Sequence, residues 1–74
     1  MTAEELIRLV DGLEDRAESY LTLDDVQQAA GADLTWAIDQ AILLVDYRTR
    51  LDGSHVTLCR LNRRHPDVAR LTAW

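Results

Sequence analysis

The segment from Tyr47 to Leu61 constrains the fold most, because it has the residue pattern of one β-hairpin. Asp52 and Gly53 stand between two runs of alternating apolar and polar residues, and Asp-Gly is a strong signal for a two-residue type I′ turn. This turn predicts a register with five side chains on an inner face: Tyr47, Thr49, Leu51, Val56 and Leu58. The outer face then carries Arg48, Arg50, His55, Thr57 and Cys59.

Two helices are predicted before position 31. Thr2 and Glu5 have the spacing of a capping box, and the apolar residues after them recur at helical spacing, which predicts a helix over 3–19. Thr22 is a suitable cap for a second helix. This helix is expected to end at Gly31, because glycine readily adopts the left-handed conformation that often closes a helix.

A third helix is predicted over 34–46, with Asp33 as its N-cap. Its apolar residues recur at helical spacing: Leu34, Ile38, Ala41, Ile42 and Val45. After the hairpin, Pro66 suits the first position of a short C-terminal helix. The apolar residues of that helix are expected to cover an open part of the core: Val68, Leu71 and Trp74.

A chain of 74 residues is expected to form a single domain over residues 1–74, with one core. Hydrophobic residues make up 47% of the chain, which is ordinary for a globular domain. No apolar run approaches the ~20 residues that a membrane-spanning helix needs, and the N-terminus is acidic where a signal peptide would be basic. We therefore expect a cytoplasmic protein with no membrane partner.

Charge is distributed unevenly along the chain, whose formal net charge is −5. Residues 1–47 hold 11 acidic residues and 2 Arg, whereas residues 48–74 hold 6 Arg and 2 Asp. A negative protein repels nucleic acid at long range, so any affinity for phosphate has to come from the C-terminal part. The charge balance thus disfavours DNA as a partner.

The succession of three helices and a hairpin resembles the winged-helix superfamily of small regulators. The resemblance covers about residues 2–61 and rests on three segments: Leu21 to Gly31, Ala32 to Val45 and the Asp52-Gly53 hairpin. It implies three helices, a two-stranded wing and a short third strand near 21–23. Together with the C-terminal helix predicted from Pro66, this makes an α+β, mainly α fold. The resemblance also implies a binding module, usually for DNA, with the third helix in the major groove and the wing on the backbone.

The outward face of the predicted third helix departs from that of a DNA-reading helix, because it carries acidic residues and no Arg. It forms an apolar strip beside carboxylates, which suits a protein partner or a second copy of the chain: Trp36, Asp39, Gln40 and Leu43. Two interpretations of Trp36 stay open. Either Trp36 is an exposed anchor of this strip, or it folds over a neighbouring helix and completes a small core.

The Arg residues of the C-terminal part provide the alternative, in which the wing binds DNA. The candidate nucleic-acid contacts are Arg48, Arg50, His55, Arg60, Arg63 and Arg64. Guanidinium groups bind phosphate well. The acidic surplus also offers them carboxylate partners within the chain, where the Arg residues would protect an exposed strand edge. The sequence leaves both uses open.

No pattern for catalysis, metal binding or a cofactor is present in the sequence. His55 and Cys59 are expected about 13 Å apart along a strand, too far to hold one zinc ion together with His65. The glycines are isolated, which excludes a phosphate-binding loop. We therefore expect no enzyme, no cofactor and no small-molecule substrate. The prediction is a non-catalytic regulatory module that works by protein contact or self-association, with DNA binding through the wing as the alternative.

Overall fold

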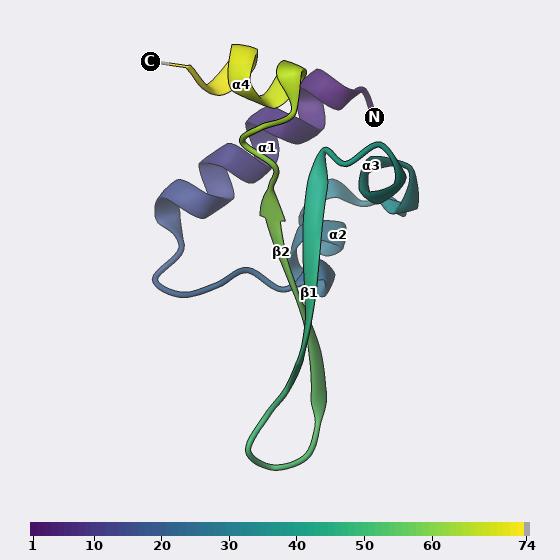
Figure 1. Cartoon of the computed structure of the whole chain (residues 1–74), viewed down its shortest axis with the longest axis vertical. Helices are drawn as coiled ribbons and strands as arrows, with labels where there is room; N and C mark the ends of the chain where they lie inside the picture. Colours follow the sequence, from purple (N-terminus) through teal and green to yellow (C-terminus); the bar gives the residue numbers. More distant parts are fainter. Residues whose placement is uncertain (74) are drawn as a thin grey trace.

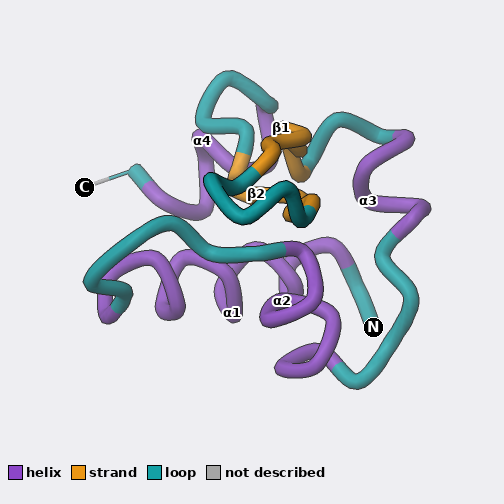
Figure 2. The backbone as a smooth tube through the Cα atoms, turned by 90° about the horizontal axis from the view of Figure 1, so that it is seen from below, coloured by secondary structure: helices purple, strands orange, loops and turns teal. Residues whose placement is uncertain are grey.

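The computed structural model describes residues 1–73, which form four helices and one two-stranded antiparallel sheet (Figure 1). The elements follow in the order α1 (Ala3–Arg16), α2 (Leu23–Ala30), α3 (Thr35–Asp39), β1 (Leu43–Thr49), β2 (His55–Leu61) and α4 (Pro66–Thr72). α1 and α2 lie together on one side of the hairpin (Figure 2), and α4 packs on α1. The chain is therefore α+β and mainly α, as the sequence predicts.

The beginnings of α1 and α2 follow the local signals in the sequence. The hydroxyl of Thr2 accepts a hydrogen bond from the Glu5 N–H at 3.2 Å, and the hydroxyl of Thr22 accepts one from the Asp25 N–H at 3.1 Å. Gly31 ends α2 with a φ of 67°, a left-handed conformation that glycine adopts without a steric penalty. These predicted helix ends are confirmed.

The third helix is much shorter than predicted, and the prediction of one helix over 34–46 was wrong. α3 ends at Asp39, and a strand begins soon after it. The chain leaves the helix through Ala41, whose φ of 58° is left-handed, and the Ile42 N–H donates to the Ala37 carbonyl at 2.9 Å. This is a Schellman termination. An alanine in this position gives no sequence signal for a helix end, and the short apolar run after it fits a strand as well as a helix.

Asp33 supports the start of α3 but does not occupy the predicted N-cap position, which is taken by Leu34. Its carboxylate accepts hydrogen bonds from the Thr35 hydroxyl at 2.7 Å and from the Thr35 N–H at 3.0 Å. These bonds hold the pKa of Asp33 below its ordinary value. α1 also differs in length from its prediction, since it ends at Arg16 and not near position 19.

The hairpin turns where the sequence predicts it, but the turn is of a different type. The Gly53 N–H donates to the Arg50 carbonyl at 3.0 Å, and the Arg50 N–H donates to the Ser54 carbonyl at 2.7 Å, which makes a three-residue loop. Gly53 has a φ of 87°, whereas the φ of Asp52 is not positive. The turn is therefore a type I turn followed by a glycine bulge, and the predicted type I′ turn was wrong.

The three-residue loop shifts the register by one residue and exchanges the two faces of β2. Val45 now faces Cys59, whose side chain points toward the helices and is only 4% exposed. The prediction that Cys59 lies on the outer face was wrong, because a slip of one residue reverses the direction of every side chain in a strand. Leu58, predicted to point inward, lies opposite Asp46.

A short extended segment pairs with β2 on the side away from β1. Thr22 forms a single bridge with Leu58, and the Cys59 N–H donates to the Leu21 carbonyl at 2.9 Å. The short strand expected near 21–23 is therefore present as one bridge.

The core receives at least one buried side chain from every helix and strand. Its buried residues are Leu6, Ile7, Val10, Val26, Leu34, Ala37, Ile42, Leu43, Cys59, Leu61 and Val68. Leu71 of α4 packs against this core as predicted, whereas Trp74 lies outside the described residues. None of the helices within residues 1–73 has the length and apolar content that crossing a membrane requires.

Candidate interaction surface

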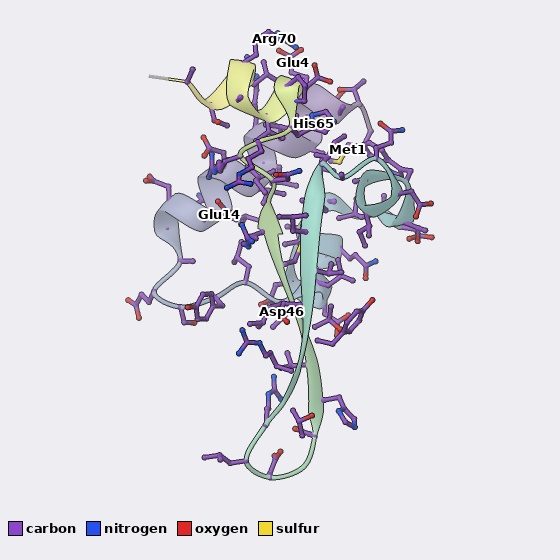
Figure 3. All side chains as sticks on the ribbon, in the orientation of Figure 1. Met1, Glu4, Glu14, Asp46, His65 and Arg70 are labelled. Carbon is purple, nitrogen blue, oxygen red and sulfur yellow. The ribbon has the colours of Figure 1, made fainter. Side chains whose placement is uncertain are left out.

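The distal half of the hairpin projects beyond the helices (Figure 1). Asp46 lies where the two strands cross and leave the rest of the molecule (Figure 3), and every residue from 46 to 53 is exposed. The molecule measures 39 Å along its longest axis and 24 and 21 Å along the others. The projecting hairpin is therefore the part of the molecule that a partner reaches most easily.

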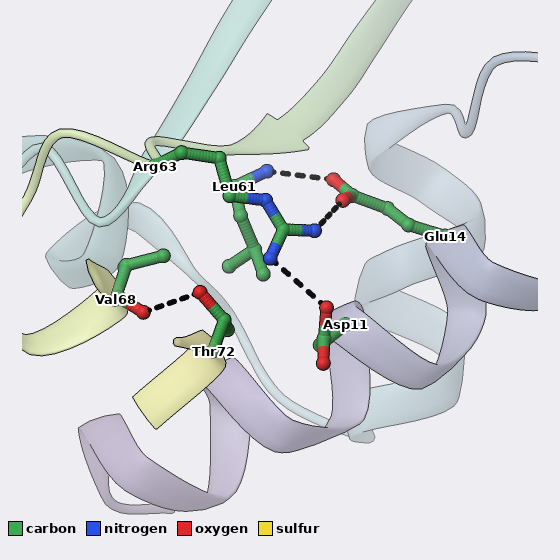
Figure 4. Close-up of polar contacts among 6 residues, drawn as sticks. All are labelled: Asp11, Glu14, Leu61, Arg63, Val68 and Thr72. Carbon is green, nitrogen blue, oxygen red and sulfur yellow. Dashed lines mark hydrogen bonds and ion pairs between the residues drawn. The ribbon is translucent and has the colours of Figure 1, made fainter. Parts of the chain in front are cut away.

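One edge of the hairpin, along β2, is partly closed by the rest of the chain. The Cys59 N–H is already bonded to Leu21, as described above. Two residues further along β2, the Leu61 N–H donates to Oε1 of Glu14 at 2.8 Å (Figure 4). A backbone segment and a side chain thus occupy two outward donors of this edge, in the part of β2 nearest the helices.

The carboxylate of Glu14 also takes part in an ion-pair cluster between α1 and the turn after β2. Its Oε2 pairs with the guanidinium of Arg63, which contacts Asp11 at 2.9 Å as well (Figure 4). Desolvation opposes the charge of Arg63, but the hydrogen bonds to the two carboxylates outweigh it and raise the pKa of Arg63. The cluster fixes the end of β2 to α1.

The other edge of the hairpin, along β1, is open. The bond between Arg50 and Ser54 sets the alternation of the ladder, so that the N–H and C=O groups of Val45, Tyr47 and Thr49 point away from β2. Among residues 1–73, no other segment forms a backbone hydrogen bond with these outward groups. α3 lies beside the beginning of β1 only (Figure 1). An open strand edge is a template for pairing with another strand.

Exposed side chains accompany the open edge. Tyr47 is 78% exposed and Leu51 is fully exposed, although the alternation in the sequence predicts both on the inner face. They lie on the part of the hairpin that extends past the helices, so no core reaches them. Asp46 and Arg48 form an ion pair at 2.7 Å, and this hydrogen-bonded contact raises the pKa of Arg48. The edge thus combines aromatic, apolar and paired charged groups.

The outer face of the hairpin bears a shallow hollow of about 550 Å³. Its lining consists of Tyr20, Leu44, Val45, Asp46, Arg48, Leu58, Cys59 and Arg60. Within the described chain no polar side chain is buried, so the hollow lacks the fixed polar group that usually orients a small ligand. Nor do three metal-ligating side chains come together anywhere in residues 1–73.

The structure separates the residues that were expected to form a partner-binding strip on the third helix. Trp36 and Asp39 lie in α3 and Gln40 follows it, but Leu43 lies in β1 and is 1% exposed. Trp36 is partly buried and packs against the core. The four-residue strip does not form, because the chain turns into β1 before Leu43 and directs this side chain inward.

The residues expected to contact phosphate lie on the hairpin and on the turn after it. Arg48 pairs with Asp46 and Arg63 pairs with α1, so both guanidinium groups have carboxylate partners. His55 is exposed at the start of β2. Within residues 1–73, three of these Arg residues form no ion pair: Arg50, Arg60 and Arg64. The set is therefore partly engaged inside the chain.

Cys59 lies on the buried face of β2, and its side chain is a protonated thiol at neutral pH. Burial, with a smaller contribution from the charge of Glu14, raises the pKa of Cys59 to about 11. A thiol with this pKa is a poor nucleophile at neutral pH, since the thiolate is the reactive form. The arrangement offers no activated cysteine.

Two features of this surface were not predicted from the sequence: the contact of Glu14 with β2, and the location of the open edge along β1. Glu14 is one of several acidic residues on α1, and no sequence signal distinguishes the one whose carboxylate reaches the backbone of β2. The register, which the turn signal did not determine, decides which N–H and C=O groups of β1 point outward. Comparisons with protein families, with curated proteins and with solved structures find no match for this chain.

Proposed function

We propose that this chain is a non-catalytic binding module of the winged-helix type, which contacts another protein through the open edge of β1. The order of the elements supports this architecture: a helix, a bridged extended segment, two helices joined by a short turn, and a hairpin in the place of the wing. α3 has only five residues. It is less than two helical turns long and offers little surface for reading a major groove.

The open edge of β1 is the observation that carries this proposal. A strand added there gains main-chain hydrogen bonds, while side chains at alternate positions provide specificity. Edge strands in many proteins are protected by Pro, by a bulge or by charged side chains, Lys above all. β1 contains no Pro, no Lys and no bulge, and its two charged residues, Asp46 and Arg48, pair with each other. A weakly protected edge on a projecting hairpin is therefore well suited to protein contact.

DNA binding through the Arg residues of the hairpin is the alternative. The pairing of Arg48 and Arg63 with carboxylates disfavours it, because binding phosphate would have to replace these contacts. The net charge of −5 also disfavours it, since a negative protein gains little from the electrostatic attraction that drives most non-specific DNA binding.

A titration with a random-sequence DNA duplex, followed by fluorescence anisotropy, distinguishes the two functions. We expect no binding at sub-micromolar affinity in physiological salt. Sub-micromolar binding that weakens in the Arg48→Ala/Arg50→Ala variant, with a smaller dependence on salt, would contradict the proposal and assign the hairpin to DNA. The variant Arg8→Ala/Arg16→Ala is the matched control, because it removes the same charge from α1.

A further inference from the structure

We propose that the partner at the open edge is a second copy of this chain, which pairs antiparallel with β1 about a two-fold axis at Tyr47. This inference rests on the proposed function and names the occupant of the same edge. It would join two hairpins into one continuous four-stranded sheet. A two-fold arrangement is the commonest closed symmetry of soluble homo-oligomers, and it requires a surface that is complementary to itself.

The backbone restricts how two copies of β1 can pair. The outward N–H and C=O groups belong to Val45, Tyr47 and Thr49, so these residues have to face outward residues of the second copy. With the axis at Tyr47, each Tyr47 faces the other, and Val45 of one copy faces Thr49 of the second. Every outward donor and acceptor between 45 and 49 then has a partner.

The charge pattern of β1 favours this register over the two neighbouring symmetric ones. With the axis at Tyr47, Asp46 of each copy lies directly opposite Arg48 of the other. With the axis at Asp46 the two carboxylates oppose each other, and with the axis at Arg48 the two guanidinium groups do. Opposite charges across a strand pair stabilise it, whereas like charges directly opposite destabilise it. The Asp46–Arg48 pair within each copy becomes a network of four charges.

The exposed apolar groups of the hairpin point to the same register. The two Tyr47 side chains, each 78% exposed in one copy, face each other across the axis, an arrangement in which aromatic residues stabilise strand pairs. Leu51 of the second copy lies level with Leu43, beside α3, so the most exposed large hydrophobic residue gains a neighbouring surface. The paired segment is short, so we expect a weak dimer of the transient class.

Charge exchange tests the register in the full chain. Sedimentation should show the unmodified protein passing from monomer to dimer as its concentration rises from about 1 µM to about 1 mM, the range expected for a small interface. The variant Asp46→Arg and the variant Arg48→Asp should each raise the dimer dissociation constant at least about tenfold, because each places like charges opposite one another. An equimolar mixture of the two variants should restore dimerisation, because the opposing charges are complementary again.

Proline substitution tests the edge independently of charge. Tyr47→Pro removes an N–H that points away from β2 and should abolish the dimer, whereas His55→Pro removes an outward N–H from the opposite edge and should not. Circular dichroism establishes that each variant is folded. If the charge variants unfold, the two proline variants test whether β1 is the paired edge. The double variant Asp46→Arg/Arg48→Asp then tests the register, because it restores opposite charges across the axis and should dimerise.

Three results would overturn the inference: a monomer over the whole concentration range, a mixture no better than the single variants, or an equal effect of the two proline variants. These failures are separate from failure of the proposed function. If the protein stays monomeric and does not bind the DNA duplex, only the identity of the partner as a second copy is refuted. Sub-micromolar binding of the duplex would refute the proposed function itself.

Discussion

Glu14 accepts a hydrogen bond from the backbone N–H of Leu61 at 2.8 Å, across 47 positions of the sequence. The same carboxylate pairs with Arg63, so one side chain closes an edge of the hairpin and holds the end of β2 on α1 (Figure 4). The hairpin thereby has one edge that is closed in its part nearest the helices and one edge, along β1, that is open.

Glu14→Ala should lower the free energy of unfolding by about 1–3 kcal/mol, because it leaves the part-buried Leu61 N–H without its acceptor. Glu14→Gln keeps a carbonyl oxygen in that place and loses only the ion pair, so the loss should be about 0.5–1 kcal/mol. Urea unfolding followed by circular dichroism measures both. Arg8→Ala, which removes an exposed ion pair with Glu4, is the control and should change the value by less than about 0.5 kcal/mol. Equal effects of the two Glu14 variants would show that the Leu61 contact contributes nothing.

Gly53→Val should destabilise the fold by about 1–3 kcal/mol, because a β-branched residue is strained at a φ of 87°. Gly12→Ala should have the opposite sign and stabilise by about 0.5–1 kcal/mol, since Gly12 lies within α1. A Cβ there would meet only the end of the Arg16 side chain, at 4.0 Å. Thermal unfolding of the two variants side by side measures both effects. A stable Gly53→Val protein would mean that the turn does not need its glycine bulge.

Ala41→Gly should leave the free energy of unfolding unchanged or raise it by up to about 1 kcal/mol. The substitution relieves the left-handed strain at a φ of 58°, and it also increases the backbone entropy of the unfolded chain, which offsets part of the gain. Ala32→Gly is the comparison, because Ala32 has no positive φ and lacks the strain to be relieved. Urea unfolding gives the free energy of unfolding of both variants. A clear loss of stability in Ala41→Gly would contradict the Schellman end of α3.

Raising the pH from neutral toward 11 should lower the free energy of unfolding, because the thiol of Cys59 ionises more readily in the unfolded chain than in the folded one. Burial raises the pKa of this thiol to about 11 in the folded chain, above its ordinary value of 9.0. The unfolded chain therefore loses its thiol proton first, so the stabilisation is complete below about pH 9 and is lost as the pH rises toward 11. Unfolding midpoints across this range measure the slope. Cys59→Ala lacks the thiol, and a slope identical to that of the unmodified protein would refute the assignment.

Amide hydrogen exchange should alternate along β1 in dilute protein. The N–H groups of Asp46 and Arg48 point toward β2 and should exchange slowly, while those of Val45 and Tyr47 point outward and should exchange fast. Exchange followed by nuclear magnetic resonance resolves these positions one by one. Slow exchange at the outward positions at low concentration would mean that the edge of β1 is covered within the monomer.

The hairpin illustrates how far sequence reasoning reaches toward the candidate surface. Asp52 and Gly53 correctly place the turn, and the alternation in β1 correctly places Arg48 on the outer face. The type of turn is decided by whether the loop holds two or three residues, and Asp-Gly is compatible with both. The backbone groups of β1 that point outward follow from that choice, and the contact that closes part of the β2 edge joins Glu14 and Leu61, which are distant in sequence.

The sequence by itself determined the features whose interactions are local. The caps at Thr2 and Thr22, the end of α2 at Gly31 and the position of the turn each depend on groups within a few residues of one another. The tertiary structure decided where α3 ends and which face of β2 is buried. The apolar residues from 41 to 45 fit both a helix and a strand, and two registers of the hairpin are locally acceptable. Burial of Ile42, Leu43 and Cys59 in the common core selects between these alternatives. Structures that are nearly equal in local free energy are distinguished only by contacts between distant segments.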